Sequence, residues 1–215
     1  DNLGIPLLDY GSAFEYAFSR DIDLGISVLY WRKLKGALLF RESKYGCINF
    51  HPALLPEYKG CGGYNLAILD ELIQWGSSCH YVDESIDTGG IIDIQKFDIV
   101  TSIETAYSLE PKTLFGMEQQ FKRIIERILL SPAGRLPVMP NIGGQYISRA
   151  FMEELKRVLP GDDPEKKSRA FWFPPYKGAW TEVNGKKMNI IPDSVLRLLG
   201  NPSATSLFAE SSNRE

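Results

Sequence analysis

Short apolar runs that alternate with loops and helical segments restrict this chain to few folds. Two such runs, Ile22 to Trp31 and Cys47 to Phe50, are typical of strands buried on both faces of a parallel sheet. The amphipathic segment after Gly62-Gly63 separates them from a third run at 77–82. Strand, loop, helix and strand in this order predict a βαβ unit with a right-handed crossover. We therefore expect an α/β protein with a Rossmann-like parallel sheet.

The rest of the chain adds helices and a hairpin. Residues 91–100 alternate and predict an outer strand, and Thr101 with Glu104 has the capping-box pattern of a long helix that ends near Leu130. Pro111 is expected to kink that helix near its start. The remaining predicted elements are a loop at 131–146, helices at 148–158 and from Asp163-Pro164, and a hairpin of Trp180–Val183 and Lys187–Ile191 around Asn184-Gly185.

Three regions follow from this order. We expect a core at 1–131, a helical and β-hairpin extension at 132–200, and a flexible polar tail at 201–215. The chain begins with Asp1, which has no signal-peptide pattern after it. No apolar run approaches the roughly 18 residues that span a bilayer.

Charge and cysteine content narrow the function. The net charge is −3 and the pI about 5.6, so no global field draws the protein to nucleic acid or to anionic membrane. The three cysteines are odd in number and lack metal-ligand spacing, and the two histidines add no ligand pattern. We expect a cytoplasmic protein with reduced thiols and no metal.

Polar side chains end two of the predicted strands. Asn49 and His51 alternate at the end of the run 47–50, so both can point to one side, and Asp87 follows the run 77–82. Ligands of open parallel sheets bind beyond the carboxyl ends of the strands, so the three side chains can converge there. Each residue alone has a plainer explanation: Asn49 could end a strand, and Asp87 could serve a turn before Thr88-Gly89-Gly90. The second histidine, His80, lies inside a strand and is interpreted as structural.

The two motifs N-x-H-P-x-L-L-P-x-x-x-G and H-Y-V-D-E-x-I-D-T-G resemble those of folate-dependent formyltransferases over residues 22–100. The resemblance implies that Asn49, His51 and Asp87 are the catalytic residues. A neutral amine would attack the formyl carbon of 10-formyltetrahydrofolate, and Asn49 would donate a hydrogen bond to the oxygen that becomes negative. Protonated His51 would stabilise that charge, while Asp87 would favour the cation and help remove the amine proton.

The resemblance also implies where the ligands bind. The pterin of the folate would lie between Trp31, Arg32, Lys33 and Leu34 on one side and Val82, Asp83, Glu84 and Ile86 on the other. The first of these segments could instead be a plain strand exit. Lys59 could face a pyrophosphate, and Trp172 and Tyr176 could stack on a base or cover a sugar, unless these aromatics fill a core under the hairpin.

The acceptor of the formyl group is the most open question. The aromatic segment F-W-F-P-P-Y and the hairpin resemble sugar N-formyltransferases, which act on dTDP- or UDP-linked amino sugars for O-antigen and other surface glycans. Methionyl-tRNA and glycinamide ribonucleotide formyltransferases are the alternatives. The resemblance implies that roughly sixty to eighty residues of the family's fold precede the position of Asp1, so we expect the core to be N-terminally incomplete. A degenerate ligand-binding homologue is a further alternative. The oligomeric state stays open, a homodimer included.

Overall fold

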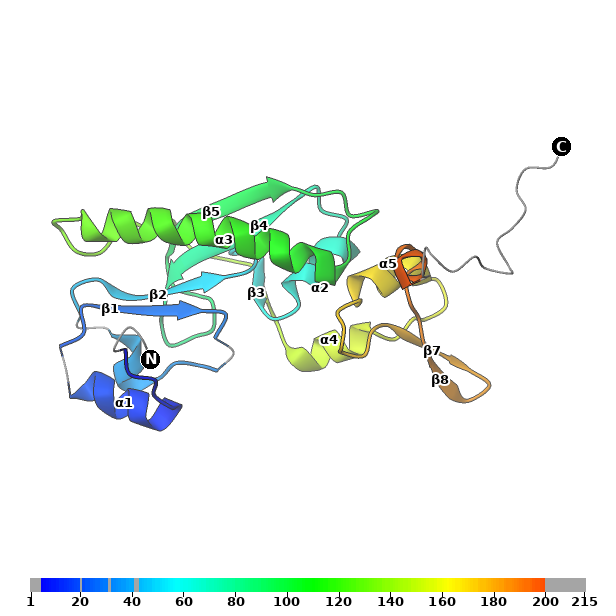
Figure 1. The fold of residues 1–215 in the computed structure, drawn as a ribbon, viewed down its shortest axis with the longest axis horizontal. Helices are drawn as coiled ribbons and strands as arrows, with labels where there is room; N and C mark the ends of the chain where they lie inside the picture. Colours follow the sequence, from blue (N-terminus) through cyan, green and yellow to red (C-terminus); the bar gives the residue numbers. More distant parts are fainter. Residues whose placement is uncertain (1–4, 20, 31, 41–42, 200–215) are drawn as a thin grey trace.

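The computed structural model describes residues 5–19, 21–30, 32–40 and 43–199. Its centre is a sheet of four strands in the spatial order β1-β2-β4-β5, and the long helix α3 (Ala106–Leu129) runs along this sheet (Figure 1). The strands are β1 (Leu24–Val28), β2 (Gly46–His51), β4 (Gln74–Tyr81) and β5 (Ile91–Asp98). Before the sheet come α1 (Tyr10–Phe18) and, between β1 and β2, the 3₁₀ helix η1 (Gly36–Leu39). The predicted α/β class is confirmed.

The prediction of a parallel sheet is wrong for two of its strands. Within this four-stranded sheet, only β1 and β2 pair in parallel, whereas β4 is antiparallel to both β2 and β5. The cause is the short helix α2 (Gly63–Leu69), which has seven residues and measures about 10 Å. A parallel crossover must carry the chain back along the length of the neighbouring strand, about 27 Å for the eight residues of β4. Because α2 ends too early for that, β4 enters the sheet from the end at which β2 leaves it.

Two hydrophobic clusters hold these layers together. One lies between α3 and the sheet and contains Phe50 of β2, Cys79 of β4, and Met117 and Ile124 of α3. The other joins α2 to the C-terminal elements around the fully buried Trp75. On the side of α3 that faces the sheet, Ile124 and Ile128 are buried, while Leu114, Phe121 and Ile125 are partly buried.

The start of α3 differs from the expected capping box. Thr105, not Thr101, is the N-cap, and it exchanges hydrogen bonds with Ser108. Glu104 is buried and bonds to Ser108 and Lys112 instead. Pro111 lies inside the helix, as predicted.

Residues 132–147, called the strap here, return along the core after α3. Near the start of the strap, the backbone N–H of Leu136 donates to the hydroxyl of Tyr81 at 2.7 Å, and Met139 forms a β-bridge with Ile91. Its last residues form β6 (Gln145–Ile147), which pairs in parallel with β3 (Tyr58–Gly60). The sequence predicts plain loops for both segments, whereas the structure pairs them across 80 positions or more of sequence.

The C-terminal elements lie at one end of the molecule (Figure 1). They are α4 (Arg149–Leu155), α5 (Pro164–Ala170), the hairpin of β7 (Trp180–Val183) and β8 (Lys186–Asn189), and α6 (Asp193–Leu199). Asp163 caps α5, and Asn184 and Gly185 turn the hairpin with φ of 50° and 74°, as predicted. The division at 131/132 stays a prediction, and the tail 201–215 lies outside the described residues. Among the described residues, no helix has the length and apolar character needed to cross a membrane.

Candidate active site

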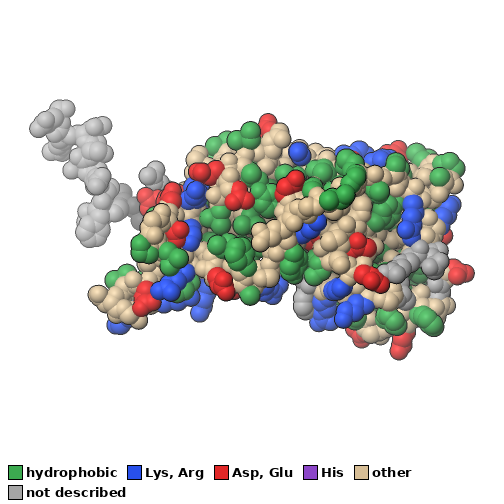
Figure 2. Space-filling model, turned by 180° about the vertical axis from the view of Figure 1, so that it is seen from behind, with side chains coloured by type: hydrophobic (Ala, Val, Ile, Leu, Met, Phe, Trp, Pro, Cys, Tyr) green, Lys and Arg blue, Asp and Glu red, His purple; other side chains and the backbone are tan. Residues whose placement is uncertain are grey.

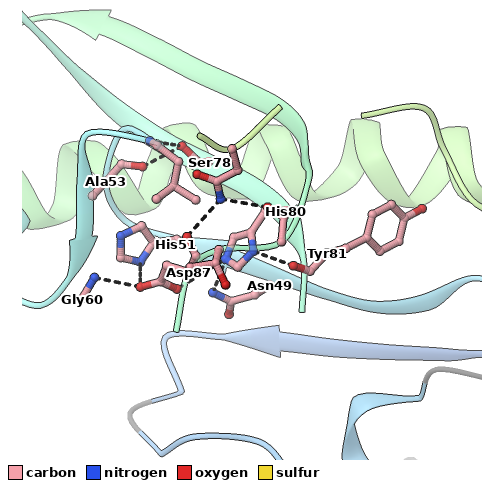
Figure 3. A network of polar contacts seen from close by, with 12 residues as sticks. Asn49, His51, Ala53, Gly60, Ser78, His80, Tyr81 and Asp87 are labelled. Atoms are coloured by element: carbon pink, nitrogen blue, oxygen red, sulfur yellow. Dashed lines mark hydrogen bonds and ion pairs between the residues drawn. The ribbon is translucent and has the colours of Figure 1, made fainter. Parts of the chain in front are cut away.

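Strands β2 and β4 bring three polar side chains to one place. Asn49 and His51 alternate along β2, and Asn49 lies directly opposite His80 in the pairing with β4. All three point toward the same cluster of polar contacts (Figure 3). The alternation expected from the sequence places Asn49 and His51 correctly, but the contact with His80 depends on the antiparallel pairing that the sequence analysis missed.

Asp87 reaches this cluster from the turn after β4. The turn is held by Asp83, whose carboxylate accepts from the backbone N–H of Ser85 and the hydroxyl of Thr88. Asp87 Oδ2 lies 3.6 Å from His51 Nδ1, and its Oδ1 lies 3.4 Å from His80 Nε2. The backbone N–H of Gly60 on β3 donates to Oδ2 at 2.9 Å. Residues of β2, β3 and β4 therefore converge on one carboxylate, and only 10% of the Asp87 side chain is exposed (Figure 3).

The hydrogen bonds assign the ring protons of both histidines. His51 Nε2 lies 2.8 Å from the carbonyl oxygen of Tyr58, which can only accept, so Nε2 carries the hydrogen. In the neutral ring, the lone pair of Nδ1 then faces Asp87. His80 Nδ1 similarly donates to the carbonyl of Tyr81 at 2.7 Å, which leaves Nε2 to accept from the Asn49 amide at 3.1 Å. His80 thus fixes the orientation of the Asn49 carboxamide.

Burial decides the protonation of His51. Desolvation lowers the pKa of His51 below its ordinary value, although the charge of Asp87 and the bond to Tyr58 act in the opposite direction. The imidazole is therefore neutral near neutral pH. The loss of hydration outweighs the attraction of one carboxylate in the resting site, and the predicted role of a protonated His51 during the reaction stays a prediction.

Asp87, in contrast, is ionised. Burial alone raises the pKa of its carboxyl, but the rings of His80 and His51, which favour the carboxylate when they are protonated, and the Gly60 N–H together outweigh it. The net effect is a pKa below the ordinary value for an aspartate. The site therefore holds a carboxylate beside a neutral imidazole base.

A cavity of about 700 Å³ opens onto this cluster. Asn49, His51 and Asp87 are among the residues that line it. It extends past α4 to the segment after α5, and its further lining includes the aromatic side chains Tyr146, Phe173 and Tyr176 and the basic side chains Arg149, Lys156 and Lys177. The cavity therefore joins acid–base groups to cations and exposed rings, which suits a ligand with an anionic part and a flat ring.

The residues predicted to bind the acceptor are placed unequally. Tyr176 lines the cavity, and its contact with a base or a sugar stays a prediction. Trp172 does not, although its neighbours Phe171 and Phe173 do. Lys59 is buried, and its ammonium donates to the carbonyl of Gly143 at 2.6 Å, so it ties β3 to the strap and does not reach the cavity.

The residues predicted to surround the pterin are also placed unequally. Ile86 lines the cavity, while Trp31 lies outside the described residues. The described members of the two segments that lie away from the cavity lining are Arg32, Lys33, Leu34, Val82, Asp83 and Glu84. Two apolar neighbours that the prediction passed over, Leu29 and Tyr30, line it instead.

Sequence reasoning also missed the basic side chains of the cavity. Arg149, Glu153 and Lys156 recur at positions i, i+4 and i+7, so α4 and its C-cap present them on one side. That spacing was a usable signal, because a charged stripe at helical period marks one face. Within the described ranges, no group of three His, Cys, Asp or Glu residues is placed to hold a metal ion.

Comparison with known proteins adds family evidence to this geometry. A GDP-perosamine N-formyltransferase from Brucella melitensis is 27% identical over 181 residues, which cover 80% of this chain and 66% of the relative. A methionyl-tRNA formyltransferase from Myxococcus xanthus is 26% identical over 196 residues, which cover 87% of this chain and 61% of the relative. The chain therefore spans just under two thirds of the length of these relatives.

A solved structure agrees on the fold. The crystal structure of an N-formyltransferase from Helicobacter canadensis in complex with folinic acid and dTDP-3-aminofucose has a TM-score of 0.67 and 27% identity. The match covers 86% of this chain and 65% of that one. The sequence profile of formyl transferases matches residues 15–125, which include β1, β2, β4, β5 and the Asp87 turn. With more than half of its length matched by that profile, the chain belongs to the formyl transferase family.

Proposed function

We propose that the full-length protein transfers a formyl group from 10-formyltetrahydrofolate to the amine of a nucleotide-linked deoxyamino sugar. The observation that carries this is the single cavity that joins Asn49, His51 and Asp87 to the basic residues of α4 and its surroundings. An acceptor with a diphosphate between a sugar amine and a base has the charge and length that such a cavity suits. The product is a formamido sugar for surface-glycan synthesis.

In the first step, the neutral amine nitrogen bonds to the formyl carbon, and the formyl C=O becomes an oxyanion. One N–H of the Asn49 amide is bonded to His80, which leaves the second N–H to donate to that oxyanion. The two bonds together would hold the carboxamide in place before the reaction begins, so little reorganisation is required.

The proton lost by the amine goes to the His51–Asp87 pair. Asp87 is ionised and attracts the ammonium proton, and Nδ1 of neutral His51 has a free lone pair 3.6 Å away. The imidazolium that forms is stabilised by the Asp87 carboxylate at Nδ1 and by the Tyr58 carbonyl at Nε2. When the intermediate collapses, the bond from carbon to N10 of the folate breaks, and the stored proton passes to N10, directly or through water.

A covalent enzyme intermediate is not part of the proposal. Cys61 is the one cysteine among the described residues that line the cavity, and burial raises the pKa of its thiol. A thiol that stays protonated is a poor nucleophile.

The apolar side chains Leu29, Tyr30 and Ile86 would pack against the donor's ring system, since they line the cavity and are each about half exposed.

The choice of acceptor rests on charge. The chain carries a net charge of −3, yet three basic side chains gather along the cavity. A local cluster suits one diphosphate, whereas tRNA binding draws on many basic contacts spread over a surface. The matches to methionyl-tRNA formyltransferases keep tRNA as the second candidate.

The proposal includes a cytoplasmic location, which the free thiols of Cys47, Cys61 and Cys79 support.

The test is a matrix of donor and acceptors with the full-length protein. Amino sugars linked to dTDP, UDP and GDP, glycinamide ribonucleotide and charged initiator tRNA are each incubated with 10-formyltetrahydrofolate. Release of tetrahydrofolate and a mass gain of one formyl group are expected with a nucleotide sugar. Formylation of the tRNA alone would replace the proposal by the second candidate, and no reaction at all would favour a ligand-binding homologue without activity.

A further inference from the structure

The strap places one carboxamide against the turn that carries Asp87. Asn141 Nδ2 lies 3.0 Å from the carbonyl oxygen of Asp87 and 2.8 Å from that of Gly89. A primary amide has two N–H groups, and both are used here. Because both partners are acceptors, the orientation of the amide follows from them. Asn141 therefore links the residue that bears the carboxylate to the glycine two positions further on.

The turn held in this way has demanding backbone geometry. Asp87 has a φ of 55°, in the left-handed region that residues with a side chain seldom adopt. Gly89 packs so closely on β4 that a Cβ there would lie 1.8 Å from the carbonyl oxygen of Tyr81. A strained turn of this kind persists only where surrounding groups hold it.

The turn sets the direction of the Asp87 carboxylate. Both carboxylate oxygens lie against fixed groups: Oδ2 accepts from the Gly60 N–H and lies beside the His51 ring, and Oδ1 lies beside the His80 ring. These groups lie on β2, β3 and β4, and they do not move with the turn. A change in the backbone angles of Asp87 would rotate its carboxylate away from all three.

Asn141 is a costly residue for stability alone. Its Oδ1 is buried and has no hydrogen-bond partner among the described residues. A buried acceptor left without a partner destabilises the folded protein. A buried polar atom without a hydrogen-bond partner is commonly kept because other atoms of the same residue serve a function. In Asn141 those other atoms are the two N–H groups of the amide.

We propose that Asn141 is a positioning residue for the reaction, whose carboxamide holds the Asp87–Gly89 turn so that the carboxylate faces His51 and His80. The catalytic meaning of this inference rests on the proposed function. Its structural content does not, because the direction of the carboxylate can be measured without turnover. The strap is thereby part of the catalytic apparatus.

The test follows the Asp87 carboxyl carbon by NMR titration in the full-length protein and in Asn141→Ala. His51 on β2 and His80 on β4 are the titratable groups that face Asp87, and their rings are followed in the same series. The pKa of Asp87 lies below its ordinary value because three contacts outweigh burial. Once the turn relaxes these contacts are lost, and the pKa should rise toward or above the ordinary value.

Gln120→Ala is the matched control. Gln120 on α3 is also a buried carboxamide that donates to a backbone carbonyl, that of Asp93 at 3.1 Å, and it lies outside the cavity lining. Its loss should destabilise the protein without moving the pKa of Asp87. If Asn141→Ala does not fold, Asn141→Ser, which keeps one donor, should give a smaller upward shift. An unchanged Asp87 pKa in a folded Asn141 variant overturns the proposal.

Turnover separates this inference from the proposed function. If the unmodified protein transfers no formyl group, the proposed function fails, and the titration still decides whether Asn141 aims the carboxylate. If it does transfer the group, Asn141→Ala should lower kcat by about 10- to 100-fold with little change in the KM of the acceptor. A shifted pKa with an unchanged kcat would show that Asn141 shapes the turn without serving the reaction.

Discussion

At the scale of single residues, the proposed mechanism makes His51 the base and Asp87 the carboxylate that together hold the proton of the amine. The hydrogen on Nε2 of His51 is engaged by Tyr58, so only Nδ1 can take up a proton, and Nδ1 faces Asp87. Burial keeps the ring neutral at rest, but a proton placed between the two groups would turn a repulsive contact into an ion pair. The pair is therefore suited to hold a proton only while the reaction is under way.

Substitution of either residue should remove most of the activity. His51→Ala deletes the base and Asp87→Asn deletes the charge, so we expect kcat to fall by about 10²- to 10⁴-fold in each variant, the range of general acid–base catalysis. Steady-state kinetics with the best acceptor measures this, and circular dichroism checks the fold. Lys122→Ala, on the exposed side of α3, is the control and should keep normal turnover. Near-normal kcat in either site variant would contradict the assignment.

The pH dependence of stability follows from the lowered pKa of His51. The unfolded chain takes up a proton on this histidine at a pH where the folded protein does not. The contribution of His51 is thus fully present above the ordinary histidine pKa of about 6.5 and is lost as the pH falls toward the folded value. The pKa of Asp87 lies below the ordinary 3.8, so its contribution to stability is fully present in this window and does not change with pH.

Urea unfolding at pH about 7.5 and about 5.5 measures this effect. We expect the midpoint to fall on acidification in the unmodified protein and to fall less in His51→Gln, which cannot titrate there. An equal fall in both proteins would mean that other groups cause it.

At the scale of elements, the short helix α4 brings basic side chains to the cavity. Met152 is buried beneath it and anchors the helix, while Arg149 and Lys156 line the cavity, with Glu153 bonded to Lys156 at 2.7 Å. The sequence predicts this helix well, because Ser148 is a good N-cap and the chain after it is a good helix former. Which side of it faces a ligand depends on where the strap delivers it.

Removing the basic side chains should weaken acceptor binding. We expect Arg149→Ala and Lys177→Ala each to raise the KM of the nucleotide sugar by about 10-fold, since each loses a charged contact with the diphosphate, and to leave the KM of the folate unchanged. Glu153→Gln should act in the opposite direction, because it removes a negative charge from the cavity. Initial rates with each substrate varied in turn give the values. Equal changes in the KM of the donor would show that these residues do not distinguish the two ligands.

Elements also show where sequence reasoning stops. The four strands of the central sheet, α5 and the hairpin are predicted because local signals mark them, such as the apolar runs, Asp163-Pro164 and Asn184-Gly185. The end of α2 is not predicted, because Glu71, just after the C-cap Asp70, has a φ of 52°, a conformation in which glycine is the usual residue. Gly76 lies inside β4, where a Cβ would meet the Gln95 carbonyl oxygen at 1.9 Å, so this glycine serves close strand packing.

At the scale of the whole molecule, charge is spread without a dominant sign. Acidic and basic side chains are interspersed over the face shown in Figure 2, and the net charge is −3. The basic residues of the cavity are an exception over a short distance only. Their role, like that of His80, depends on contacts between distant segments, so local patterns in the sequence could not predict the complete site. The pairing of Asn49 with Asp87 through His80 is the clearest case.

This charge distribution predicts weak binding to tRNA. Because nucleic-acid affinity comes largely from basic contacts with phosphates, we expect no salt-dependent binding of initiator tRNA at physiological ionic strength. Electrophoretic mobility shift of labelled tRNA with the full-length protein tests this, with a known tRNA-binding formyltransferase as the positive control. Tight binding that weakens steeply with salt would favour the second candidate function.

The strap limits how this family could exchange acceptor specificity by recombination. Between the end of α3 and the start of α4 it bonds to Tyr81, Ile91, Asp87 and Gly89, and its last residues pair with β3. A chimera joined at 131/132 would give a foreign strap to the native Asp87 turn and separate partners that fit each other. A junction after Ile147 would keep those partners together and exchange only α4 and the elements C-terminal to it. Donor chemistry and acceptor choice would then be inherited as separate units, with the strap travelling with the donor half.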